Sequence, residues 1–149
     1  MIKVYTDGSY NQNKKKAGWS FIILENEKII ASDSGFIENS DQLGWQIVGE
    51  LNAVIEAVFY AKKKGFKEIT IFSDLELSKK LFYGIQRAHK FYTKNYISIL
   101  KDAVKNGLNI KIEWVKGHSD NKYNNQADEL ANEAAFCLET SKKPMILNC

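Results

Sequence analysis

The sequence predicts an α/β protein in which helices pack on a mixed five-stranded sheet. Two observations lead to this class: five short segments have the apolar, β-rich pattern of strands, and the longer segments repeat apolar residues at helical spacing. The expected order is βββαβααβα, in which each strand–helix–strand unit implies parallel strands joined by a right-handed crossover. A chain of 149 residues is suited to one domain with one sizeable core.

The first three strands are expected to form an antiparallel meander. Ile2–Thr6 is predicted as a strand that runs into the turn residues Asp7-Gly8-Ser9. The polar stretch Asn11–Lys16 then reads as a loop or hairpin connection. The second and third strands are expected at Ala17–Leu24 and Lys28–Ile37.

Helices then alternate with short strands. Apolar residues at helical spacing predict an amphipathic helix over Gly44–Lys64, with Gly65 as its C-cap. The other elements are expected at Glu68–Ser73 (strand), Leu75–Tyr83 (short helix), Phe91–Asn106 (helix closed by Gly107), Asn109–Val115 (strand) and Asn124–Glu139 (helix). Residues 1–140 should therefore form one domain, followed by a tail over 141–149 that lies outside the core.

Charge and cysteine content limit the partners and the compartment. The net charge of +3 permits a polyanionic partner without requiring one. Arg87 is the only arginine, so any nucleic-acid binding should rely on lysine contacts to the backbone, with little sequence preference. Cys137 and Cys149 do not build a disulfide framework, which indicates a reducing, cytoplasmic compartment. Neither a signal peptide nor a membrane-spanning run is expected.

Four acidic residues stand where a purely structural role would not favour them: Asp7, Glu50, Asp74 and Asp128. Asp7 and Asp74 end predicted strands, and ligand sites of open sheets form outside the carboxyl ends of parallel strands. Glu50 falls within the apolar stripe of its helix, and Asp128 falls in the first turn of the last helix. If strands one and four are neighbours, these acids can meet in one pocket.

Each acid also has a plain structural interpretation that stays open. Asp7 could form a turn, and Glu50 could reach water from the edge of its stripe. Asp74 could cap the following helix, and Asp128 could be favoured by the helix dipole. If the acids converge, however, their repulsion requires cations, and oxygen ligands favour Mg²⁺ or Mn²⁺. A pair of such ions can activate a water and stabilise the leaving oxygen of a phosphoryl displacement.

The same residues resemble the motifs of type 1 ribonucleases H. The matching segments are Tyr5–Ser9, Gly49–Leu51 with Ala53, Ile71–Asp74, Val115–His118, and Asn124 with Ala127, Asp128, Leu130 and Ala131. The resemblance covers about residues 2–136 and is greatest to a bacterial branch, whose extra N-terminal hybrid-binding domain is expected to be absent here. It implies a ribonuclease H-like fold and an endoribonuclease that cuts the RNA strand of RNA–DNA hybrids, leaving 5′-phosphate and 3′-hydroxyl ends.

The resemblance also implies a role for each matched residue. Asp7 would bridge a pair of Mg²⁺ ions, for which Mn²⁺ is a possible substitute. Asp128 would help to hold the ion that activates the attacking water, and Glu50 and Asp74 would hold the ion near the leaving group. His118, on a flexible loop, would assist proton transfer or product release, although a surface loop histidine is the structural alternative.

The substrate contacts expected from the resemblance are the backbone groups of Gly8 and Ser9, together with Asn13, Gln46 and Asn124. Hybrid selection needs contacts to the 2′-hydroxyls of one strand and to the deoxyriboses of the other. Ordinary solvation in loops is the alternative for the amide side chains. The protein is expected to act as a monomer on RNA–DNA hybrid, without a membrane.

Two departures from the family concern the grip on substrate. Glu76 stands where the family often has Gln, and an ionised acid cannot donate to an RNA hydroxyl. The basic stretch Gly84–Lys94 looks shorter than in some members, which predicts modest affinity for the DNA strand, and Phe82 or Tyr83 could stack on a deoxyribose. A DNA nuclease and a non-catalytic nucleic-acid-binding module on the same fold remain competing hypotheses.

Overall fold

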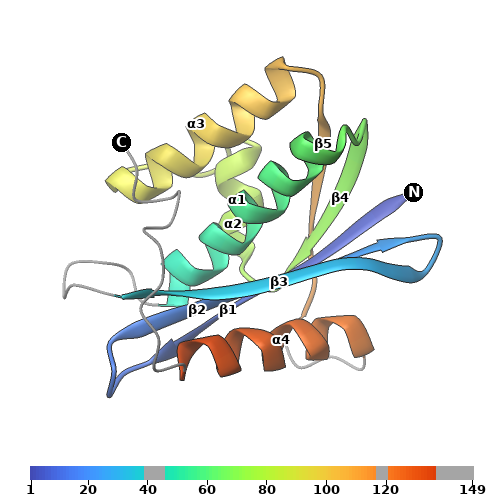
Figure 1. Cartoon of the computed structure of the whole chain (residues 1–149). Helices are drawn as coiled ribbons and strands as arrows, with labels where there is room; N and C mark the ends of the chain where they lie inside the picture. The colour runs from blue at the N-terminus through green and yellow to red at the C-terminus, as the bar shows by residue number, and fades with distance from the viewer. Residues whose placement is uncertain (39–45, 117–120, 137–149) are drawn as a thin grey trace.

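The computed structural model describes residues 1–38, 46–116 and 121–136, and these residues form the predicted α/β architecture (Figure 1). The sheet has five strands in the order β3-β2-β1-β4-β5. The elements are β1 (Ile2–Asn11), β2 (Lys16–Glu25), β3 (Lys28–Glu38), α1 (Gln46–Lys64), β4 (Glu68–Ser73), α2 (Glu76–Phe82), α3 (Phe91–Lys105), β5 (Asn109–Trp114) and α4 (Lys122–Ala135). The predicted order of elements is confirmed.

The first strand is much longer than the sequence suggested. It pairs with β4 in parallel only through Lys3–Tyr5, and then continues to Asn11 as the antiparallel partner of β2. The segment Asp7-Gly8-Ser9 therefore lies inside β1, opposite Ser20, Trp19 and Gly18, and its prediction as a turn was wrong. Because β1 runs past the end of β4, Asp7 still reaches the carboxyl edge of the parallel pair.

Helices cover both faces of the sheet (Figure 1). Helices α1 and α3 pack on one face over a hydrophobic core that includes Val4, Leu51 and Ile71. Helix α4 crosses the other face over a smaller cluster that includes Tyr5, Ile22 and Ala127. The end of the sheet near Asp7 therefore receives side chains from α1 on one face and from α4 on the other.

Helix boundaries follow local capping. Gly65 and Gly107 adopt φ of +74° and +104° just beyond α1 and α3, as the sequence predicted. Helix α4 begins before its predicted start at Asn124, because the Asn121 side chain accepts hydrogen bonds from the backbone N–H groups of Tyr123 and Asn124. Its predicted end at Glu139 and the tail over 141–149 lie outside the described residues. Among the helices described, none has the length and apolar character needed to cross a bilayer.

Candidate active site

Three of the four predicted acids meet at the end of the parallel strands. Carboxylate oxygens of Asp7, Glu50 and Asp74 all lie within 4.8 Å of one another. Asp7 and Glu50 are buried and Asp74 is half-buried. Glu50 therefore does not reach water from the edge of its helix, and Asp7 does not form a turn. We call these three residues the acid cluster.

Glycine at position 8 allows α1 to approach β1 at the cluster. A side chain on Gly8 would place its Cβ 2.8 Å from the Glu50 Cα and 2.9 Å from the Gln46 carbonyl oxygen. Both distances are shorter than van der Waals contact, and both neighbours are backbone atoms that cannot turn aside. The glycine of the Asp-Gly-Ser segment thus sets how closely Glu50 lies beside Asp7.

The Glu50 carboxylate has one satisfied and one unsatisfied oxygen. Thr6 Oγ1 and Ser73 Oγ both donate to Glu50 Oε1, over 2.8 and 2.7 Å. Glu50 Oε2 is buried without a hydrogen-bond partner, although the residue is only 2% exposed. A buried, unpartnered carboxylate oxygen is costly unless a cation reaches it.

Asp74 and Asp128 complete the acidic lining from two further elements. Asp74 follows β4 directly and is not the cap of α2, because the N-cap residue is Leu75. Trp114 Nε1 donates to the Asp74 carbonyl oxygen over 3.1 Å and so fixes the backbone there. Asp128 lies in the second turn of α4, where the helix dipole contributes little, because the helix starts earlier than predicted. It lines one pocket with Asp7 and Asp74.

Burial and mutual repulsion shift the titration of the cluster. Burial, followed by the negative charge of Glu50, raises the pKa of Asp7 to about 10, and hydrogen bonding to Asp128 adds to the shift. Burial and the charge of Asp74 raise the pKa of Glu50 to about 7, against the hydrogen bonds from Ser73 and Thr6 that lower it. Without a cation, the cluster therefore retains protons near neutral pH.

The residues fit a hard divalent cation. The cluster offers only carboxylate oxygens, and Mg²⁺ and Mn²⁺ prefer oxygen ligands. The unpartnered Glu50 Oε2 and the raised pKa values both indicate a site that positive charge would relieve. Among the described residues, the group that could hold a metal ion consists of carboxylates alone, which favours a hard cation over zinc.

The pocket over these acids has a neutral polar wall. Its volume is about 210 Å³. Besides Asp7, Asp74 and Asp128, it is lined by Gly8, Ser9, Gln46, Asn124, Asn125 and Asn132. Gln46 Nε2 donates to the Gly8 carbonyl oxygen over 3.3 Å. Asn124 is only 3% exposed, and its Oδ1 lacks a hydrogen-bond partner.

Four of the five expected substrate residues therefore line this pocket, and one does not. Asn13 is exposed in the turn between β1 and β2, outside the pocket lining, and its backbone N–H donates to Asn11 Oδ1. Its family-based assignment to the substrate stays a prediction. His118, with its loop, lies outside the described residues.

Sequence reasoning missed three residues that shape the site. Thr6 and Ser73 were noted only as motif letters, yet they hold the Glu50 carboxylate. Asn132 was not singled out, although it stands four residues after Asp128 and so shares its helix face. That spacing was a signal available in the sequence, whereas the contacts of Thr6 and Ser73 required the pairing of β1 with β4.

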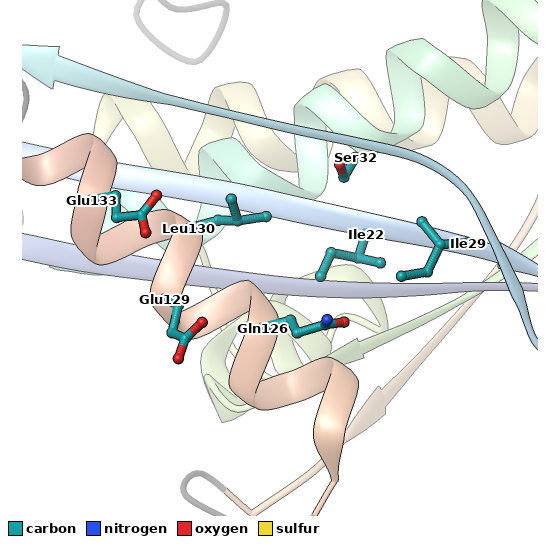
Figure 2. Close-up of a pocket in the computed structure, with 7 residues that line it drawn as sticks. All are labelled: Ile22, Ile29, Ser32, Gln126, Glu129, Leu130 and Glu133. Atoms are coloured by element: carbon teal, nitrogen blue, oxygen red, sulfur yellow. The ribbon is translucent and has the colours of Figure 1, made fainter.

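A second hollow, of about 200 Å³, lies between α4 and the β2–β3 hairpin (Figure 2). Its lining is Ile22, Ile29, Ser32, Gln126, Glu129, Leu130 and Glu133, which includes none of the four predicted acids. Glu129 directly follows Asp128 in sequence but lines a different hollow. Asp128 and Glu129 therefore face different hollows on the two sides of α4. Substitution of Glu129 is thus a matched control for substitution of an acid of the site.

Comparisons with known proteins agree with this architecture. The family model described as RNase H matches residues 1–136. A "Ribonuclease H" of Buchnera aphidicola subsp. Baizongia pistaciae is 33% identical, covering 90% of each chain. A "Ribonuclease H" of Acetivibrio thermocellus is 31% identical, covering 89% of this chain and 92% of the relative. The structure of LC11-RNase H1 in complex with RNA/DNA hybrid has a TM-score of 0.76 at 23% identity, over 91% of this chain and 96% of that one, and supports the fold alone.

Proposed function

This chain belongs to the ribonuclease H family, and we propose that it is an endoribonuclease that hydrolyses the RNA strand of RNA–DNA hybrids. The reaction would use a pair of Mg²⁺ ions, with Mn²⁺ as a substitute, and would leave 5′-phosphate and 3′-hydroxyl ends. One observation carries the proposal: carboxylates from β1, α1 and the end of β4 bring oxygens within 4.8 Å of one another, with Asp128 lining the same pocket.

Each residue of the site has a role that follows from its position. Asp7 belongs to the acid cluster with Glu50 and Asp74 and lines one pocket with Asp128. It would therefore hold both cations, one together with Glu50 and Asp74 and the other together with Asp128. Bound Mg²⁺ supplies an activated water and stabilises the charge that develops on the leaving oxygen. Thr6 and Ser73 keep the Glu50 carboxylate turned toward the cluster through their hydroxyl groups. His118 would assist proton transfer or product release, a role that rests on its motif alone.

The neutral wall of the pocket supports a hybrid substrate. Ser9, Gln46 and Asn124 present hydroxyl and amide groups, which recognise the 2′-hydroxyls of an RNA strand better than a purely basic surface would. The unpartnered Oδ1 of Asn124 is an acceptor suited to such a hydroxyl. LC11-RNase H1, which shares the fold, was solved in complex with RNA/DNA hybrid.

The compartment, the oligomeric state and the domain bounds are inferred from the sequence. We expect a reducing, cytoplasmic compartment, because the chain has only Cys137 and Cys149 and no disulfide framework. We expect a monomer, since one chain supplies all four acids. Residues 1–140 would act as the catalytic domain, with 141–149 as a tail.

The test is a cleavage assay with Mg²⁺ on labelled RNA–DNA hybrid, RNA duplex, DNA duplex and single-stranded RNA. We expect cutting of the hybrid alone, with phosphate on the 5′ side of the break. Cutting of DNA would favour a DNA nuclease, and binding without cutting under any divalent ion would favour a non-catalytic module. Glu129→Gln, which removes a carboxylate beside Asp128 outside the pocket, should behave as the unmodified protein.

A further inference from the structure

Asn132 connects two parts of the pocket that come from different elements. Its Oδ1 accepts a hydrogen bond from Ser9 Oγ on β1. Its Nδ2 donates to Asp128 Oδ2 over 3.4 Å, within α4. All three residues line the pocket above the acid cluster. One planar amide therefore joins a residue expected to meet the substrate to one expected to hold a cation.

The amide oxygen of Asn132 can only accept a hydrogen bond, so the Ser9 hydroxyl must donate to it. A hydroxyl group has one proton to donate, and Ser9 gives it to Asn132. The Ser9 oxygen then has only lone pairs left to offer to a ligand in the pocket. Such an acceptor can bind the O–H of a ribose 2′-hydroxyl. A deoxyribose has no 2′-hydroxyl and so offers it no donor.

Few side chains could replace Asn132 in both contacts. Aspartate could accept from Ser9 but could not donate to Asp128, and it would add repulsion beside that carboxylate. Lysine could donate to Asp128 but could not accept from Ser9. Only a neutral group with both a donor and an acceptor satisfies the two neighbours at once.

We propose that Asn132 is a positioning residue that sets Ser9 as an acceptor for a ribose 2′-hydroxyl and steadies Asp128 at the same time. The proposal rests on the hybrid-cleaving function proposed above and adds to it a residue and a source of sugar selectivity. Asn132 itself does not need to touch the substrate. Its two contacts couple the recognition of the RNA strand to the geometry of the acids.

The two contacts can be broken one at a time. Asn132→Asp keeps the acceptor for Ser9 and should retain preference for hybrid over DNA duplex while lowering kcat. Asn132→Lys keeps a donor for Asp128 and should retain most of kcat while losing about 5-fold of that preference, the worth of about one hydrogen bond. Opposite effects on selectivity and turnover would not arise from a merely structural residue.

Binding measured without cleavage separates this proposal from the proposed activity. In an Asp7→Asn background, we would compare the Kd of hybrid and of DNA duplex by fluorescence anisotropy for Ser9→Ala, Asn132→Ala and the double variant. We expect each single variant to lose about 5-fold of the preference and the double variant to lose no more than Ser9→Ala alone. Gln126→Ala, an exposed amide on the same helix that lines the other hollow (Figure 2), should change nothing.

The outcomes are distinct. Additive losses in the double variant, or equal weakening toward hybrid and DNA duplex, would overturn the role of Asn132 even if the protein cleaves hybrids. Absence of cleavage in the unmodified protein, with the binding pattern intact, would overturn the proposed activity and leave the positioning role standing. Thermal unfolding of every variant checks that the fold is retained.

Discussion

The acid cluster and the connection between α2 and α3 (Tyr83–Lys90) are built in opposite ways. Asp7 and Glu50 are buried between sheet and helix, and hydroxyl donors and a close backbone contact at Gly8 fix their positions. In the connection, by contrast, Tyr83 is 47% exposed and Ile85 is 69% exposed. The first region is held by the core of the protein, and the second rests on its surface.

This difference predicts that the acid cluster determines the chemical step, whereas the connection contributes to affinity for the substrate. Changes in the cluster disturb the fold and the reaction together, because the same contacts serve both. Changes in the connection should alter affinity for nucleic acid with little effect on the chemical step. Variants of the cluster and variants of the connection test the two sides of that division.

The largest effect is expected for Asp7→Asn. Cleavage of hybrid should fall by at least about 100-fold, because the variant loses a carboxylate that would hold both cations. Glu129→Gln is the control, since it removes an exposed carboxylate on α4 that lines the other hollow. Near-normal cleavage by Asp7→Asn would show that the cations are held elsewhere.

The same variant should stabilise the metal-free protein. The raised pKa of Asp7, about 10, means that the folded protein retains a proton that the unfolded chain releases from about pH 4 upward. The free energy of unfolding of the unmodified protein therefore falls as the pH rises from about 4 to about 10. Asn at position 7 does not titrate, so the variant avoids this loss of stability. We expect a gain on the order of 1–3 kcal/mol at pH 7, measured by urea unfolding in EDTA, and no such gain at pH 4.

Gly8→Ala should damage both folding and cleavage. A methyl group at this position would push the backbone of α1 away from β1 at Glu50, and overpacking of this kind costs about 1–3 kcal/mol. Gly84→Ala is the contrasting variant, because its added Cβ meets nothing within 4 Å but its φ of +73° strains a side chain. Gly84→Ala should lose about 1 kcal/mol of stability and keep its rate of cleavage.

Ser73→Ala should shift the pH dependence of cation binding. The Ser73 hydroxyl donates to Glu50 and lowers its pKa, so its removal should raise that pKa above its present value of about 7. Because a cation competes with protons for the carboxylate, Mg²⁺ affinity rises with pH through this range. We expect the pH midpoint of Mg²⁺ affinity, measured by calorimetric titration at several pH values, to rise by roughly half a unit to one unit. This shift corresponds to the loss of one hydrogen bond worth about 1 kcal/mol. An unchanged midpoint would mean that Thr6 alone sets the Glu50 carboxylate.

The sequence predicted the order of the elements well, because the apolar periodicity is regular and the helix-closing glycines stand where α1 and α3 end. It failed at Asp7-Gly8-Ser9, where turn-forming residues lie within a strand. Pairing with β2 overrides local propensity there, and pairing between strands is not visible in a local pattern.

The site was predicted unevenly for a similar reason. An acid within an apolar stripe identified Glu50, and the structure places it in the cluster. Thr6 and Ser73 escaped notice, because a hydroxyl on a strand gives no sign of its partner until β1 and β4 are brought together. Asn13 fits the spacing of the family motif but lies outside the pocket lining, so its contact with the substrate stays a prediction.

The smallest effect is expected in the α2–α3 connection. Arg87 and Lys101 line a hollow of about 650 Å³ beside it, and both can meet phosphate groups. Arg87→Ala should weaken hybrid binding about 2- to 5-fold and reduce the slope of log affinity against log salt by about one, with kcat unchanged. Lys63→Ala is the control, because Lys63 is exposed near the far end of α1, roughly 20 Å along the helix from Glu50. A fall in kcat for Arg87→Ala would break the division, because a surface residue would then act on the chemical step that the buried cluster is expected to control alone.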